Sequence, residues 1–220
     1  MVHIDELESL LKFSGASQSQ HKQDLFVLSE LGFKHNGYFV EFGATNGKDI
    51  SNSWLLENMF GWTGIIAEPG VVWHEELFKN RKCHIETKCV WSKTGEKLTF
   101  NQTINPDLSC INDYSDHDMW AYNRRNGKTY DVETISLNDL LEKYNAPTEI
   151  DYLSIDTEGS EFEILSNFNF DKYKIKVITC EHNHTPMREF IQQLLAVYGY
   201  ERKYTNLSGV DDWFVLNEKV

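Results

Sequence analysis

The sequence is poor in cysteine, and no two cysteines stand in a C-x-x-C pair. Its four cysteines are widely scattered: Cys83, Cys89, Cys110 and Cys180. At least two of them lie inside apolar, strand-like runs. This placement predicts buried, reduced thiols and a cytoplasmic protein.

Long apolar runs are also absent. No uninterrupted run approaches the length needed to cross a bilayer, so we expect no membrane insertion. The first 13 residues carry Asp5, Glu6 and Glu8 and have no basic leader before an apolar stretch. This pattern predicts that the chain does not start with a signal peptide.

Basic residues are outnumbered by acidic ones. The chain has 21 Lys and Arg against 34 Asp and Glu, which gives a formal net charge of −13. Such a field repels the phosphate backbone of nucleic acids, so we expect no nucleic-acid partner.

The remaining composition is that of a globular protein. Of the 220 residues, 40% are apolar and 13% are aromatic, which is enough for one substantial core. We expect an N-terminal helix and linker over residues 1–20 and a single domain over residues 21–220. The N-terminal helix is a candidate contact between copies in an oligomer.

Apolar periodicity alternates between strand and helix spacing along the chain. Strands are predicted at 38–42, 63–67, 83–91, 97–101, 132–135, 150–156, 175–181, 200–204 and 213–216. Helices are predicted at 4–13, 22–31, 50–60, 71–79, 137–144, 160–165 and 187–198. This order predicts an α/β fold with a mostly parallel sheet covered by helices on both faces. The last two strands follow each other directly, so one of them must run antiparallel.

Several helix ends carry recognisable signals. Gly61 stands where a helix is expected to end. Capping boxes are predicted for Ser136 with Asp139 and for Ser160 with Glu163. Thr185, followed by proline, is predicted to cap the helix over 187–198.

A cofactor loop follows the first predicted strand of the domain. An apolar run reaches Glu41 and passes into a loop bounded by Gly43 and Gly47. About 20 residues later, as in dinucleotide-binding folds, a second apolar run ends at Glu68. Glycine lets the backbone approach a ligand closely, and a terminal carboxylate can bind the two hydroxyls of a ribose.

The loop lacks the third glycine of the G-x-G-x-x-G pattern that binds a pyrophosphate. Glu41 would repel a phosphate and attract a cation. S-adenosylmethionine has a ribose, a sulfonium and an ammonium but no phosphate, so it fits better than NAD, and an NAD-linked oxidoreductase is the weaker hypothesis.

Acidic residues stand at the ends of four predicted strands: Glu41, Glu68, Asp156 and Glu181. In an open α/β sheet, ligands bind beyond the carboxyl ends of the strands. Since each buried charge is costly unless it is paired, four at one edge require a common explanation.

Residues 151–165 resemble the D-x-L-x-I-D-x-E-G-x-E-x-x-x-L signature of FkbM-type methyltransferases. The similarity extends over roughly 19–216, and four further segments contribute to it: Ser19-Gln20 with Asp24, Val40 to Ala44 with Gly47, Glu181-His182-Asn183, and Asp211 to Phe214. The resemblance implies a class I, Rossmann-like fold that uses S-adenosylmethionine. It also implies a methylated hydroxyl on a sugar or a glycosylated product.

The resemblance implies roles for particular residues. The methionine part of the cofactor would be surrounded by Glu41, Gly43, Ala44, Asn46, Gly47 and Ser53. Glu68 and Pro69 would bind the ribose, and Cys89, Val90 and Trp91 would lie near the adenine. Asp156 would reach the cofactor ammonium or the acceptor hydroxyl.

Some of these acids also have purely structural explanations. Glu161 and Glu163 fall in a first helical turn, where acids favour the helix dipole, and Glu158 can pair within its loop. Asp156 can be a buried carboxylate with a basic partner. Glu68 has the right spacing for a ribose.

Asp156, Glu181 and His182 lie at adjacent predicted strand ends and are the candidate catalytic residues. They could bind Mg²⁺, which would acidify an acceptor hydroxyl. Alternatively, His182 acts directly as a general base or is structural. His182-Asn183-His184 also resembles an H-N-H nuclease string, but it follows an apolar α/β strand, which is the wrong context.

Residues 102–130 have no clean period and are long for a connection, which predicts an acceptor-binding loop or lid. Four aromatic residues alternate there with polar ones: Tyr114, Trp120, Tyr122 and Tyr130. Such a surface suits a sugar, but a packed lid or an oligomer contact is equally consistent. Arg124-Arg125 could pair with an anionic acceptor or with the acidic surface of the protein.

The sequence therefore predicts an S-adenosylmethionine-dependent O-methyltransferase that acts on a hydroxyl of a saccharide or related metabolite by in-line transfer. The alternative is a non-catalytic module of the same fold that binds the cofactor or a glycan.

Overall fold

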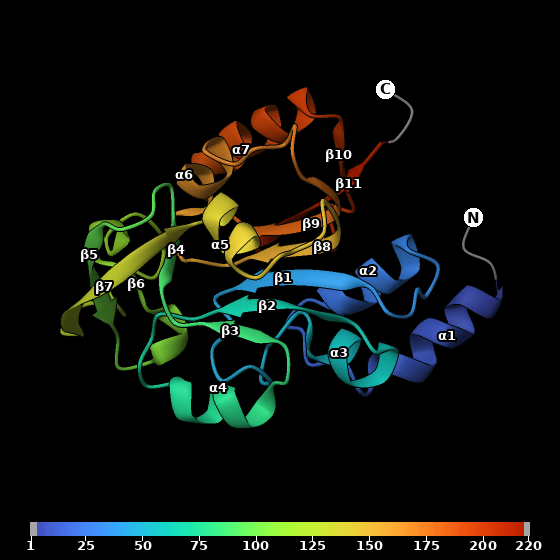
Figure 1. Ribbon diagram of the computed structural model, residues 1–220, viewed down its shortest axis with the longest axis horizontal. Coiled ribbons are helices and arrows are strands. Elements are labelled where there is room, and N and C mark those ends of the chain that lie inside the picture. Colours follow the sequence, from blue (N-terminus) through green and yellow to red (C-terminus); the bar gives the residue numbers. More distant parts are fainter. Residues whose placement is uncertain (1–3, 218–220) are drawn as a thin grey trace.

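Seven strands form the central sheet, in the order β10-β11-β9-β8-β1-β2-β3 (Figure 1). The computed structural model describes residues 4–217. The strands are β1 Tyr38–Phe42, β2 Thr63–Ala67, β3 His84–Glu86, β8 Glu149–Ile155, β9 Lys174–Glu181, β10 Tyr200–Lys203 and β11 Asp211–Leu216. β1, β2, β3, β8 and β9 pair in parallel, and β11 runs antiparallel to both β9 and β10. The predicted sheet with an antiparallel strand is confirmed.

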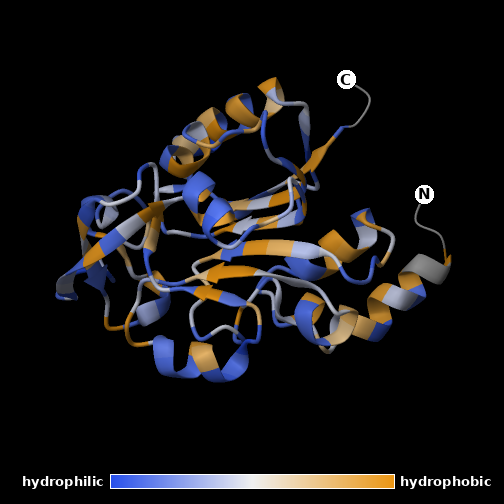
Figure 2. Ribbon diagram, in the orientation of Figure 1, coloured by the Kyte–Doolittle hydropathy of each residue, from blue (hydrophilic) through white to orange (hydrophobic). Residues whose placement is uncertain are grey.

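Helices cover both faces of this sheet (Figure 1). One face is covered by α2 Gln23–Glu30, α3 Trp54–Phe60 and α4 His74–Asn80, and the other by α5 Leu137–Lys143, α6 Glu161–Ser166 and α7 Met187–Val197. Because strand side chains alternate, Val40 and Phe42 enter one core while Phe39 enters the other. Apolar residues dominate the central strands, whereas the helices carry both kinds (Figure 2).

The N-terminal helix α1, Ile4–Ser14, lies beside α2 at one end of the sheet (Figure 1). The ring of Phe13 contacts the ring of Phe60 edge-on, with centroids 4.8 Å apart. Among the described residues, no helix has both the length and the apolar character that a membrane span requires.

A second sheet lies to one side of the first (Figure 1). Its strands, in the order β4-β7-β5-β6, are β4 Cys89–Trp91, β7 Lys128–Ser136, β5 Lys97–Gln102 and β6 Cys110–Ile111. The prediction of one strand over 83–91 was wrong, because Glu86 accepts hydrogen bonds from the Thr87 and Lys88 N–H groups and the chain turns into the second sheet there.

The prediction that 102–130 is irregular was also wrong in part. This stretch contains β6, two 3-10 turns at Pro106–Leu108 and Asn112–Tyr114, and the start of β7. β7 pairs with β5 over six residues, from Lys97↔Glu133 to Gln102↔Lys128. Pairing between segments so far apart in the sequence leaves no local period to detect.

The predicted helix ends were right at two positions. Ser136 caps α5 by accepting from the Asp139 N–H at 3.1 Å, and Gly61 ends α3 with a φ of 67°. At α7 the prediction was wrong, because the capping position is Pro186 and no side chain caps the helix. Helices α3 and α4 begin later than expected, at Trp54 and His74.

The late start of α3 has a specific cause in the loop after β1. Arg81, whose side chain is 0% exposed, follows α4 and binds this loop from inside. Its guanidinium donates to the Gly47 carbonyl and the Ser51 hydroxyl, both at 3.1 Å. It also pairs with the carboxylates of Glu41 and Glu57. One buried cation therefore holds together β1, the loop and two helices.

We expect Arg81→Met to destabilise the protein by about 3–5 kcal/mol, because it leaves Glu41 and Glu57 buried without a counter-charge. Urea unfolding followed by tryptophan fluorescence measures this loss. Lys79→Met is the matched control, since Lys79 pairs with Glu75 at the surface, where both side chains are largely exposed, and its loss should not change the midpoint. Equal midpoints for the two variants would contradict the role of Arg81.

Candidate functional site

Two adjoining hollows form a crevice at the carboxyl ends of β1, β2 and β8. The first has mainly apolar walls that include Phe42, Val90, Phe100 and Ile111. We call it the apolar chamber. The second is lined by the four acids Glu68, Asp107, Asp156 and Glu158, and we call it the acidic chamber. Gly43, Glu68, Ser109 and Asp156 line both chambers.

Gly43 allows the two central strands to end close together. Its φ is 72°, and a Cβ atom there would lie 1.8 Å from the backbone oxygen of Asp156. No other residue fits, because any side chain would strain the backbone and collide with β8. The narrow floor of the crevice therefore depends on this glycine.

Glu68 follows β2 and lies buried between both chambers. One carboxylate oxygen accepts from the Thr45 N–H at 3.0 Å and the other from the Gly70 N–H at 2.7 Å. Burial raises the pKa of Glu68 to about 7, and these two N–H donors only partly oppose that rise. It has no cationic partner among residues 4–217. A ligand with hydroxyls or positive charge would stabilise its ionised form.

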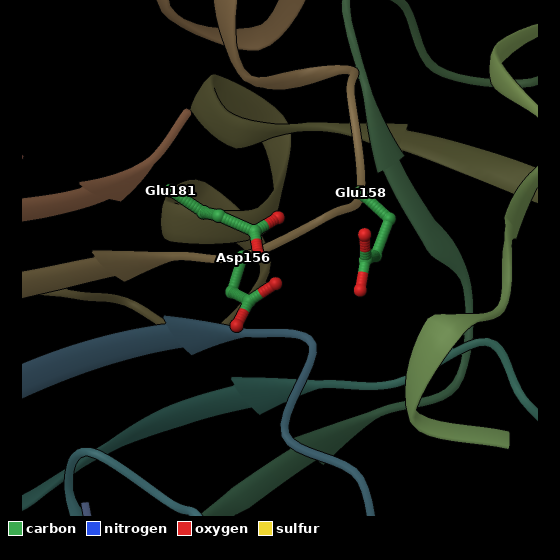
Figure 3. Close-up of side chains that lie close together, drawn as sticks. All are labelled: Asp156, Glu158 and Glu181. Atoms are coloured by element: carbon green, nitrogen blue, oxygen red, sulfur yellow. The ribbon is translucent and has the colours of Figure 1, made fainter. Parts of the chain in front are cut away.

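Three carboxylates meet beside Glu68, from the end of β8, the following loop and the end of β9 (Figure 3). One oxygen from each of Asp156, Glu158 and Glu181 lies within 4.8 Å of the other two. Burial, and then mutual repulsion, raises the pKa of Asp156 and Glu181 well above the usual range. Burial also raises the pKa of Glu158 to about 7, although Arg124 opposes the shift. A positively charged ligand would relieve this repulsion.

The loop after β8 is held by Glu161. Its carboxylate accepts from the Thr157 N–H, the Thr157 hydroxyl and the Gly159 N–H, each at 3.0 Å. The predicted capping box of Ser160 and Glu163 was wrong, because the Ser160 hydroxyl donates to Thr157 instead and caps nothing. Glu161 thus positions the backbone that carries Glu158.

Arg124 is not available to an anionic acceptor. Its side chain is fully buried and binds both oxygens of Asp118, at 2.6 and 2.8 Å. It also contacts Glu158 at 2.5 Å. The expectation of an anionic acceptor or surface partner was therefore wrong for Arg124. The next residue, Arg125, is exposed and lies over the ring of Tyr122.

Several residues predicted to contact the cofactor lie outside the crevice and hold the loop after β1. Glu41 accepts from the Ser51 hydroxyl, the Asn52 N–H and the Ser53 hydroxyl. The Asn46 side chain donates to Asp49 and Glu76. Ala44 is packed in the core under α3 and α4, and a Cβ atom at Gly47 would meet Arg81 and Leu77.

His182 lies outside both chambers and outside the three-carboxylate group. Its Nδ1 accepts from the His184 N–H at 3.0 Å, and its Nε2 is 3.9 Å from Asp212. Burial lowers its pKa to about 4, so the imidazole is neutral near neutral pH. The structure thus brings together five of the predicted residues: Gly43, Glu68, Pro69, Val90 and Asp156. Glu181 is adjacent to Asp156, and His182 does not line the crevice.

Sequence reasoning missed most of the walls that the second sheet contributes. Phe100, Asp107, Ser109 and Ile111 line the crevice. We call residues 106–111 the roof segment, because its members line both chambers opposite the strand ends. No motif marks these residues, because they reach the site only through β5–β6 and β5–β7 pairing.

Comparisons with known proteins identify the family of the chain and similar folds. A family profile described as "Methyltransferase FkbM domain" matches residues 41–202. Among solved structures, a methyltransferase FkbM from Methylobacillus flagellatus KT is similar over 97% of this chain and 58% of its own length, with 11% identity and a TM-score of 0.53. A precorrin-6y C5,15-methyltransferase from Geobacter metallireducens GS-15 is similar over 87% and 85%, with 12% identity and a TM-score of 0.45. No curated protein matches the sequence.

The raised pKa of Glu68 predicts how stability depends on pH. The folded protein holds a proton on Glu68 up to a pKa of about 7, whereas the unfolded chain loses it near the usual glutamate pKa of 4.5. The folded state therefore binds more protons in this window, and the free energy of unfolding falls as pH rises through it. Glu68→Gln should remove about 3 kcal/mol of that fall.

Urea unfolding at about pH 5 and about pH 8 checks this expectation. Glu201→Gln, at an exposed position in β10, is the control and should behave as the wild type. The same loss of stability between the two pH values in Glu68→Gln and in the wild type would contradict the assignment.

Proposed function

The chain belongs to the FkbM methyltransferase family, and on that premise we propose that it transfers a methyl group from S-adenosylmethionine to a hydroxyl of a saccharide or glycosylated metabolite. One observation carries the proposal: an apolar chamber and an acidic chamber meet at Glu68 and Asp156. A ligand with a flat base, a ribose and a cationic end matches that order.

The apolar chamber suits the adenine. Val90, Phe100 and Ile111 offer apolar surface to a ring. Glu68, at the junction of the chambers, would accept hydrogen bonds from the ribose hydroxyls, with Pro69 beside it. A buried carboxylate is a strong acceptor for this purpose, because bonds to a charged group are roughly twice as strong as neutral ones.

The acidic chamber suits the methionine part of the cofactor. Asp156 lies against the floor glycine, Gly43, and lines the chamber with its neighbours, so its carboxylate would attract the ammonium and the sulfonium. Positive charge there would offset the repulsion between Asp156, Glu158 and Glu181. A pyrophosphate would increase that repulsion, which argues against NAD.

When bound, S-adenosylmethionine supplies a methyl group on a sulfonium, which an acceptor oxygen takes by in-line displacement. The chain's main task is then to align the acceptor with that methyl group. Burial and mutual repulsion raise the pKa of Asp156 and Glu181, so the ionised form of either is a stronger base than an ordinary carboxylate. Asp156, which lines the acidic chamber, would take the proton that leaves the acceptor hydroxyl, with Glu181 beside it. His182 would have a positioning role, because its Nδ1 accepts from the His184 N–H and so holds the chain after β9.

Mg²⁺ is a further candidate for this site. Asp156, Glu158 and Glu181 offer oxygen ligands of the hard type that Mg²⁺ prefers. The amide nitrogen of Asn183 donates to Glu158, and its buried amide oxygen has no hydrogen-bond partner among residues 4–217 and could complete the set. The ion would lower the pKa of the acceptor hydroxyl. His182 is replaced by Glu158 in this proposed ligand set.

A labelled methyl transfer assay tests the activity. Radiolabelled S-adenosylmethionine is incubated with a panel of sugars and glycosylated compounds, with Mg²⁺ or with EDTA. Asp156→Asn should abolish transfer and keep cofactor binding within about tenfold. Binding without transfer by the wild type, across the panel, would instead favour a non-catalytic module of this fold.

Cofactor binding has its own test. S-adenosylhomocysteine at about 100 times its dissociation constant should stabilise the wild type by about 2.7 kcal/mol in a thermal-shift titration. Glu68→Gln should weaken this binding by about 10- to 100-fold, because a neutral amide replaces a charged acceptor.

Glu86→Gln is the matched control for that titration. Glu86 is another buried glutamate at the end of a strand, but it pairs with Lys143 at 2.6 Å and lies outside both chambers. Its variant should bind as the wild type. Equal binding by Glu68→Gln and Glu86→Gln would remove the ribose role, and no stabilisation of the wild type would remove the cofactor.

A further inference from the structure

The roof segment and the floor loop meet at one buried side chain. The floor loop, residues 157–159, follows β8 and carries Glu158 into the acidic chamber. Arg124 stands between the two. Its Nε donates to the Leu108 carbonyl of the roof segment at 2.9 Å, and its guanidinium contacts Glu158 of the floor loop at 2.5 Å.

Asp118 fixes the orientation of this guanidinium. Both of its oxygens accept from Arg124, through separate nitrogens, so the planar group cannot rotate while the pair persists. All three charged side chains are buried, with exposed fractions of 0% for Arg124, 3% for Asp118 and 7% for Glu158. Arginine suits three separated acceptors because its five N–H groups are spread over a rigid, planar fork.

The other hydrogen bonds of the roof segment are made to residues close to it, in or beside the second sheet. Ser109 accepts from the Thr103 N–H, and β6 pairs with β5 at Cys110 and Ile111. Across the part of the chain that the structure describes, no other hydrogen bond or ion pair joins 106–124 to the floor loop. The ring of Tyr114 packs near Gly159, but that contact is non-polar.

We propose that Arg124 is a positioning residue that fastens the roof segment to the floor loop and thereby sets how long the cofactor stays in the crevice. The claim that Arg124 sets how long the cofactor stays, which we call retention, rests on the proposed function. The claim that Arg124 joins the roof segment to the floor loop, which we call fastening, does not. With the fork in place, the roof segment covers both chambers. A lysine ammonium is compact and lacks the planar fork, so it cannot span the three separated acceptors, and the roof segment separates from the floor loop more often.

Arg124→Lys is the informative variant, and Arg125→Lys is its matched control because Arg125 is the adjacent, exposed arginine. Amide hydrogen exchange of the ligand-free proteins measures the fastening. We expect exchange in the roof segment to rise at least about tenfold in Arg124→Lys and to stay unchanged in Arg125→Lys. Amides of β1 and β8 should keep their protection, whereas a general loss of stability would expose them too.

Stopped-flow dissociation of S-adenosylhomocysteine measures the retention. We expect it to be about tenfold faster from Arg124→Lys than from the wild type or Arg125→Lys. Unchanged exchange in the roof segment would overturn the fastening, and faster exchange with an unchanged dissociation rate would overturn the retention. A wild type that does not bind S-adenosylhomocysteine would defeat the proposed function, while the exchange data would still decide the fastening.

Glu158→Gln covers the case in which Arg124→Lys does not fold. This variant keeps the contacts of Arg124 with Asp118 and Leu108 and removes only the charge on the floor loop. It should raise roof-segment exchange in the same direction, and wild-type exchange in this variant would overturn the fastening.

Discussion

Repulsion between buried carboxylates is the constraint on which this site depends. Parallel strands end at one edge of the sheet, and here that edge brings Asp156, Glu158 and Glu181 within 4.8 Å of one another. Glu158 and Glu181 are buried and Asp156 is half-buried, so little water screens their charges and their pKa values rise. The cluster is favourable only if protons or a cationic ligand compensate it. A site that is unfavourable when empty is one that gains from binding positive charge.

The two buried arginines of the protein pair with some of its buried acids and leave others without a counter-charge. Arg81 neutralises Glu41 and Glu57, and Arg124 binds Glu158. Each arginine fixes a loop that borders the crevice, and its guanidinium group is bound by acceptors of the protein itself. Glu68 and Asp156, in contrast, have no basic partner within residues 4–217. The acids paired with Arg81 hold the loop after β1, Glu158 lines the acidic chamber with Arg124 bound to it, and the unpaired Glu68 and Asp156 line both chambers.

The second sheet turns an open strand edge into a two-chamber crevice. Phe100, Ile111 and the roof segment supply the apolar surface that the central sheet alone does not offer. The same inserted segment carries Arg124 back to the floor loop, so one part of the chain both covers the site and is anchored to it.

The sequence alone determined the central fold. Short-range periodicity located β1, β2 and β8, and the acids that follow β2 and β8, Glu68 and Asp156, lie at the edge of the sheet where the crevice is. Only the tertiary structure decided which acids face a ligand. Glu41, like Glu68, is an acid at the end of an apolar run, yet its carboxylate pairs with Arg81, a residue 40 positions away. The tertiary structure also decided that residues 83–91 divide between two sheets and that Arg124 is buried. The position of the roof segment over the crevice is a third such feature. Each depends on pairing between distant segments, and local patterns carry no record of which distant partner a strand or a charge will meet.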